Sequence, residues 1–172
     1  MEGHRRAGED AGRRPTELTT GGGARSRSLR ARMAGPWRVA VAEGSMLPAL
    51  QPGDWLLLNP LGRGWPPVGS LVVFREPLSG TLAIKRVAGG PGDRVEFAGG
   101  FLTLDQDEAW LTADADASTT AAAGFGPPID STRFGPVPVE NLVGRVLFRY
   151  GPPGRIGRIG RLGRVGRVGR KA

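Results

Sequence analysis

Few residues in this sequence can serve as a base, a metal ligand or a cross-link. Among its 172 residues there is no cysteine and only one histidine, His4. Without cysteine the chain can form neither disulfides nor thiolate metal sites. Because His4 stands alone in a polar N-terminal stretch, a Ser-His-Asp triad and a histidine metal site are excluded as well. We therefore expect no cofactor and no metal, and any serine hydrolase here needs a base other than histidine.

Long apolar runs are also missing. No run of about 18 apolar residues occurs, so no membrane-spanning helix is expected. Residues 1–35 are rich in Arg, Gly, Ser and Thr and lack the apolar core of a signal peptide, so they are expected to be disordered. Met33 stands just before the first strand-like segment, and we hypothesise that it is the true start. The expected location is cytoplasmic or peripheral on a membrane.

The positive charge, formally +8 at pH 7, is unevenly distributed. Residues 1–35 carry +4 and residues 151–172 carry +7, whereas residues 36–150 carry −3. These boundaries divide the chain into a basic N-terminal tail, a central domain and a C-terminal tail. Any attraction to phosphate or to anionic lipid therefore belongs to the tails, and nucleic acid is not an expected partner.

The C-terminal tail repeats a Gly-Arg-aliphatic unit between Gly154 and Gly169. Glycine at every third position costs a helix about 1 kcal/mol each relative to alanine, so a helix is not expected. Two interpretations stay open: a tether to an anionic membrane surface, and a solvated, disordered tail.

Between residues 36 and 150, short apolar runs alternate with Gly and Pro, which is typical of an all-β domain. No stretch has helical periodicity long enough to predict a helix. Gly99-Gly100 indicates a hairpin, and residues 61–67 read as a loop. The expected strands are Trp37–Ala42, Trp55–Asn59, Leu71–Arg75, Thr81–Val87, Arg94–Phe97, Phe101–Leu104, Ala109–Leu111 and Leu142–Tyr150.

A stiff loop is expected around Ser45, between the first two strands. Pro48 and Pro52 remove backbone donors and fix φ, and Gly53-Asp54 is typical of a turn. A side chain on such a loop can be presented to a substrate rather than packed. An ordinary loop serine is the alternative.

Lys85 lies in the strand-like run 81–87, between Ile84 and Val87. Burial there disfavours the charged form and lowers the pKa of the amine, and a neutral amine can activate a serine nucleophile. The chain has 22 arginines but only one other lysine, Lys171. The use of lysine rather than arginine at position 85 therefore indicates a side chain that has to lose its proton. Strand alternation should direct Arg86 to the opposite face. A solvated strand lysine is the alternative.

Both segments together resemble the signal peptidase I family of serine proteases. The family's Ser-Met box with Pro, Leu and Gly-Asp is matched by Ser45-Met46, Pro48, Leu50 and Gly53-Asp54. Its lysine box is matched by residues 85–87 and 91–93, its Gly-Asp-Val-Val-Phe-Arg strand by 68–75, and its Asp-Ser-Arg and Phe-Gly-Pro-Val box by 130–138. The resemblance implies a fold of short antiparallel strands, with Ser45 as nucleophile and Lys85 as general base.

The resemblance also implies residues that support the site. Met46 packs beside the nucleophile, and Asp130, Ser131 and Arg133 hold the site together. The arginine is displaced by one position, with Thr132 in its expected place.

In the family a serine orients the lysine. Ser118 takes this role if residues 119–129 are an insertion; otherwise Pro128 occupies the position and the hydroxyl is missing. Glu43 stands where some relatives have an oxyanion-donating serine, and a carboxylate cannot donate. The backbone N–H of Ser45 is therefore the implied oxyanion donor.

The function implied by the resemblance is removal of an N-terminal extension from a precursor protein. The chain looks most like the soluble nickel superoxide dismutase maturation proteases. Secretory signal peptide processing by an anchorless signal peptidase I is an alternative. A LexA-like self-cleaving regulator and an inactive binding homologue are further alternatives.

Overall fold

A computed structural model describes residues 37–60 and 62–160 of the chain. The N-terminal tail with His4 and Met33, and most of the repeat with Lys171, lie outside the described residues. The described strands are β1 Trp37–Ala40, β2 Trp55–Asn59, β3 Leu71–Arg75, β4 Leu82–Gly89, β5 Arg94–Phe97, β6 Gly100–Thr103, β7 Glu108–Thr112, β8 Val137–Pro138 and β9 Leu142–Gly151. Two short helices, α1 Ala117–Ala122 and α2 Ser131–Phe134, complete the α and β elements.

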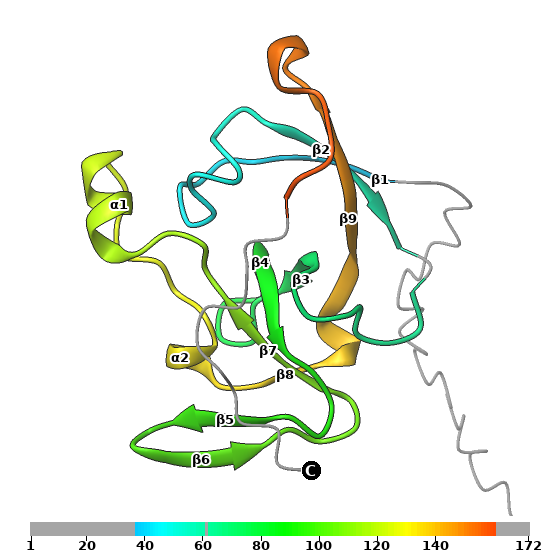
Figure 1. Cartoon of the computed structure of the whole chain (residues 1–172), viewed down its shortest axis with the longest axis vertical. Coiled ribbons are helices and arrows are strands. Elements are labelled where there is room, and N and C mark those ends of the chain that lie inside the picture. Colours follow the sequence, from blue (N-terminus) through cyan, green and yellow to red (C-terminus); the bar gives the residue numbers. More distant parts are fainter. Residues whose placement is uncertain (1–36, 61, 161–172) are drawn as a thin grey trace, which may run out of the picture. The chain divides into compact units, whose positions relative to one another are not determined.

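The all-β prediction is confirmed by the sheet topology. Seven antiparallel strands follow the order β1-β2-β9-β3-β4-β7-β8, and β5 pairs with β6 in a separate hairpin. Figure 1 shows this hairpin at the end of the molecule opposite β1 and β2. The hairpin predicted at Gly99-Gly100 is confirmed, because Phe97 pairs with Gly100.

Strand β3 connects two parts of the hydrophobic core. Its alternating residues Leu71 and Val73 belong to one cluster, whereas Val72 and Phe74 belong to another. All of these side chains are buried, which explains why this strand is a continuous apolar run rather than an alternating one. Its neighbour β4 carries Lys85 and is paired with β3 from residue 82 to residue 86.

The two helices correct the expectation that the domain has none. Each begins at an aspartate whose carboxylate accepts a backbone N–H: Asp116 from Thr119 in α1, and Asp130 from Thr132 in α2. Helices of six and four residues are too short to produce a periodic apolar pattern, so the sequence signal was confined to their caps.

Packing continues beyond residue 150, where the central domain was expected to end. Strand β9 reaches Gly151, a 3₁₀ turn follows at Pro153–Arg155, and Gly157 forms a bridge with Arg149. The first residues of the expected tail therefore join the domain. Between residues 37 and 160, no described helix has the length and apolar character needed to cross a bilayer.

Candidate active site

Ser45 lies on the loop that connects β1 to β2, here called the Ser45 loop (residues 41–54). Two hydrogen bonds close its base, from Val41 N to Asp54 O and from Gly53 N to Val41 O, each 2.8 Å long. Within the loop, Leu50 N donates to Met46 O over 2.8 Å. These three hydrogen bonds hold Ser45 in a short, closed loop.

The buried residues of the loop anchor it in the first core cluster. Met46 is 1% exposed and Leu50 is fully buried, and both belong to the cluster that also contains Leu71 and Val73. Ser45 itself is only half-buried. Its backbone oxygen accepts a hydrogen bond of 3.2 Å from Ala115 N, which ties the loop to the segment after β7.

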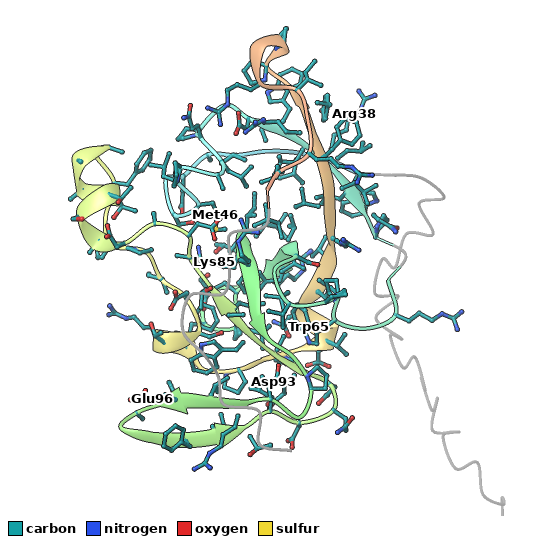
Figure 2. All side chains as sticks on the ribbon, viewed as in Figure 1. Arg38, Met46, Trp65, Lys85, Asp93 and Glu96 are labelled. Atoms are coloured by element: carbon teal, nitrogen blue, oxygen red, sulfur yellow. The ribbon has the colours of Figure 1, made fainter. Side chains whose placement is uncertain are left out.

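The structure brings Lys85 to Ser45. Lys85 is 3% exposed, and its Nζ donates a hydrogen bond of 2.7 Å to Ser45 Oγ. Figure 2 shows the Lys85 side chain extending from β4 toward the loop that carries Met46. The two residues stand 40 positions apart in the chain, and their side chains meet because the loop and β4 share the core.

Burial lowers the pKa of the Lys85 amine below the ordinary lysine value. The negative charges of Asp130, Glu43 and Asp114 act in the opposite direction but do not cancel the effect of burial. A lowered pKa increases the fraction of neutral amine at a given pH, and the neutral amine is the form that can accept a proton.

Arg86 is also buried, and its charge is neutralised within the fold. Its guanidinium forms two hydrogen bonds with the Asp114 carboxylate, at 2.7 and 2.5 Å, and a third of 2.8 Å with Gly69 O. Sequence reasoning missed Asp114 as the partner. The signal available in the sequence was an acidic residue shortly after the expected apolar strand Ala109–Leu111.

Asp130 and Ser131 hold the chain just before Asp114. Asp130 Oδ2 accepts a hydrogen bond of 3.0 Å from Ala113 N. Ser131 is fully buried, and its Oγ accepts one of 2.9 Å from Leu111 N. These contacts fix the end of β7, from which the chain reaches the Ser45 loop.

Ser118 and Arg133 are not brought to the Ser45–Lys85 pair. Ser118 is exposed on α1, and its hydroxyl donates to Asp116 Oδ1 over 2.8 Å, so the expectation that it orients Lys85 is corrected. The reason is local: Asp116 caps α1 and binds the hydroxyl two residues on. Arg133 is exposed on α2 and forms no ion pair within residues 37–160.

Gly44 allows the segment after α1 to pack on the Ser45 loop. A Cβ at this position would lie 2.6 Å from Phe125 Cδ2, closer than real Cβ contacts allow. Phe125 itself is held by a hydrogen bond of 2.9 Å from its N–H to Thr120 O. Any larger residue before Ser45 would therefore displace the aromatic ring or the loop.

One backbone donor beside the pair is free to bind a ligand. Within the described ranges, no hydrogen bond uses the N–H of Ser45. Glu43, two positions earlier, is exposed. The site thus combines a hydroxyl, a buried amine of lowered pKa and a free N–H, the set of groups that acyl transfer through a serine requires.

Comparisons with known proteins agree with this chemistry. A sequence profile of the family described as signal peptidase, peptidase S26, matches residues 28–123, which include Ser45 and Lys85. The chain is 27% identical over 141 residues to probable thylakoidal processing peptidase 2 of Arabidopsis thaliana, covering 68% of this chain and 38% of that protein. It is 27% identical over 144 residues to thylakoidal processing peptidase 1 of the same plant, covering 68% and 42%. With signal peptidase I of Bacillus caldolyticus it shares 29% identity over 143 residues, covering 65% and 78%.

Proposed function

Because this chain belongs to the signal peptidase family, peptidase S26, we propose that it is a serine endopeptidase that removes an N-terminal extension from a precursor protein. The observation that carries the proposal is the 2.7 Å contact between Ser45 Oγ and the buried Lys85 Nζ. A serine and a lysine in such a contact can act as nucleophile and general base without histidine.

In the proposed reaction, Ser45 Oγ attacks the carbonyl carbon of the scissile bond while Lys85 Nζ accepts the hydroxyl proton. The Ser45 N–H stabilises the negative charge that develops on the carbonyl oxygen. Lys85 then transfers its proton to the leaving amine nitrogen, and the C–N bond breaks to leave an ester on Ser45. A water molecule, deprotonated by Lys85, hydrolyses the ester, and its proton returns to Ser45 Oγ.

The edge of β4 next to Lys85 offers a binding place for an extended substrate. Strand β7 pairs with β4 only from Arg86 onward, so among the described residues 82–85 have no strand partner on that side. The other side of this half of β4 is paired with β3. An extended peptide can add to such an open edge through backbone hydrogen bonds, which would align it beside the Ser45–Lys85 pair.

The proposed substrate is a nickel superoxide dismutase precursor. Two features support it: the spacing of 40 positions between Ser45 and Lys85, and the sequence that ends β9, because both resemble the proteases that mature this precursor. Secretory signal peptide processing is the second candidate, and the names of the relatives, signal peptidase I and thylakoidal processing peptidase, favour it.

A cleavage assay separates these two substrates. The purified full chain is incubated in parallel with a nickel superoxide dismutase precursor and with a secretory preprotein. Mass spectrometry of the new N-termini then identifies the products, and the Ser45→Ala variant is the control. We expect the dismutase precursor to be cut once, at the start of its mature chain. Cleavage of the secretory preprotein alone would reverse the choice of substrate.

Two other functions stay open alternatives: a LexA-like self-cleaving regulator and an inactive binding homologue. A covalent serine-directed probe tests the second. We expect it to label the wild-type chain, and to fail with Ser45→Ala. Incubation of the chain alone, without substrate, tests the first, because a self-cleaving regulator would shorten itself. Contact of the repeat with an anionic membrane surface stays a prediction that falls mainly on residues outside the described ranges.

A further inference from the structure

The first two units of the Gly-Arg-aliphatic repeat, residues 154–159, pack against the domain at the base of the Ser45 loop. After β9 the chain turns back, and Arg149 and Gly157 exchange two backbone hydrogen bonds of 3.0 and 2.9 Å. Figure 1 shows this segment returning alongside β9. Ile159 then packs against the core cluster that contains Met46 and Leu50, the two buried anchors of the loop.

Arg155 of the repeat binds the last residue of the Ser45 loop. Its Nε donates to Asp54 Oδ1 over 2.9 Å, and its Nη2 donates to Asp54 Oδ2 over 3.0 Å. The Asp54 side chain is 1% exposed and that of Arg155 is 28% exposed. Two parallel hydrogen bonds fix the direction of the carboxylate as well as its distance, which a single lysine ammonium cannot do.

The same carboxylate holds the second half of the loop. Asp54 Oδ2 also accepts hydrogen bonds from Gln51 N, at 2.9 Å, and from Arg149 Nη1, at 3.0 Å. Arg149 Nη1 donates in addition to Ala49 O over 3.2 Å. Beside the apolar contact of Ile159, a chain of polar contacts through Asp54 and Arg149 thus connects the repeat to the residues that follow Ser45.

We propose that Arg155 is a positioning residue of the active site, which acts through Asp54 to hold the loop that presents Ser45 to Lys85. The inference rests on the proposed function, because the position of Ser45 matters only if it is the nucleophile. It assigns the start of the repeat a role distinct from a tether. Arg155 makes no hydrogen bond with Ser45 or Lys85, so its effect is geometric, and a displacement of about 1 Å can lower a rate about a hundredfold.

Two arginines of the repeat provide a matched comparison in the full chain. Arg155→Gln removes the contact with Asp54. Arg158→Gln is the control, because Arg158 is exposed and forms no ion pair within the described residues.

In the wild type and both variants, the rate of amide hydrogen exchange in peptides from the Ser45 loop is compared with the rate in peptides from β3. We expect Arg155→Gln to accelerate exchange in the loop alone, with kcat about tenfold to a hundredfold lower and KM little changed. Arg158→Gln should match the wild type in every measurement.

A double-mutant cycle tests whether the effect passes through Asp54. Asp54→Asn should reproduce the faster exchange, and the double variant should be no worse than Asp54→Asn alone. If Arg155→Gln does not fold, Arg155→Lys replaces it in the same cycle. Additive effects, or loop exchange equal to that of Arg158→Gln, would overturn the inference. If instead the wild type cleaves no substrate, the proposed function fails, whereas the exchange data still decide whether Arg155 holds the loop.

Discussion

Lys85 and Arg86 are consecutive buried residues of β4, but only Arg86 is paired with a carboxylate. The Arg86 guanidinium is matched by the Asp114 carboxylate and by Gly69 O. The Lys85 amine is buried, no carboxylate among the described residues is bound to it, and its hydrogen bond goes to the Ser45 hydroxyl. Arg86 is therefore paired with a carboxylate, whereas Lys85 is bonded to the hydroxyl that it is proposed to deprotonate.

Removal of either member of the pair should abolish proteolysis. Ser45→Ala eliminates the attacking oxygen, and Lys85→Ala should lower kcat by at least about a hundredfold, the usual contribution of a general base. Cleavage of a precursor, followed by gel and mass spectrometry, measures both. Ser118→Ala and Lys171→Ala are the controls and should retain wild-type rates. Activity that survives Lys85→Ala would mean that another group is the base.

The rate should rise from neutral into mildly alkaline pH. Burial lowers the pKa of Lys85, but the amine must still lose a proton before it can act, so the active fraction grows as pH increases through that pKa. A pH profile of kcat/KM measures this. With its only histidine, His4, in the N-terminal stretch, the profile should show no break near the histidine value of about 6.5. A profile flat from pH 7 to pH 10 would contradict the role of Lys85.

Lys85→Met should be more stable than the wild type at neutral pH. Because the folded-state pKa of Lys85 is lowered, the unfolded chain binds more protons between the folded and unfolded pKa values, and wild-type stability rises with pH across that window. The advantage of the methionine variant should therefore shrink as pH approaches about 10.4, the value for an unfolded lysine. Urea unfolding at pH 7 and pH 10 measures it. An advantage that stays constant with pH would contradict a depressed pKa.

Asp114→Asn should destabilise the fold by about 3 to 5 kcal/mol, because it leaves the Arg86 guanidinium buried without a counter-charge. The free energy of unfolding in urea measures the loss. Asp105→Asn is the matched control, since Asp105 is exposed, and it should stay within about 0.5 kcal/mol of the wild type. Equal effects of the two substitutions would mean that the ion pair contributes nothing to stability.

Gly44→Ala should disturb the site, because its Cβ would meet Phe125 at 2.6 Å. We expect a loss of about 1 to 3 kcal/mol in the free energy of unfolding, the usual cost of overpacking, and a lower kcat because Ser45 is the next residue. Gly126→Ala, whose Cβ would meet no described atom within 4 Å, should be close to neutral. Phe125→Leu in the Gly44→Ala background should recover part of both losses, and no recovery would point to a different cause.

The sequence alone determined the two chemical segments and every strand except the two-residue β8, which was not predicted. Strands β2, β3 and β5 have the predicted bounds. Short apolar runs bounded by turn residues predict strands rather than helices. The prolines and the Gly-Asp turn predicted a stiff loop at Ser45, and the apolar neighbours of Lys85 predicted its burial. Local chemistry was sufficient for these features, since each depends on residues within a few positions of one another.

Only the tertiary structure decided which distant side chains meet. Ser118, which the family pattern placed with the lysine, instead binds the aspartate that caps α1. Arg155 belongs to a repeat with no distinguishing feature at that unit, yet it binds Asp54, 101 positions away. Because the Gly-Arg-aliphatic units are so alike, the sequence does not show which of their arginines binds a buried carboxylate. That choice depends on where β9 ends and how the chain turns back beside it, and it follows from packing rather than from any local pattern.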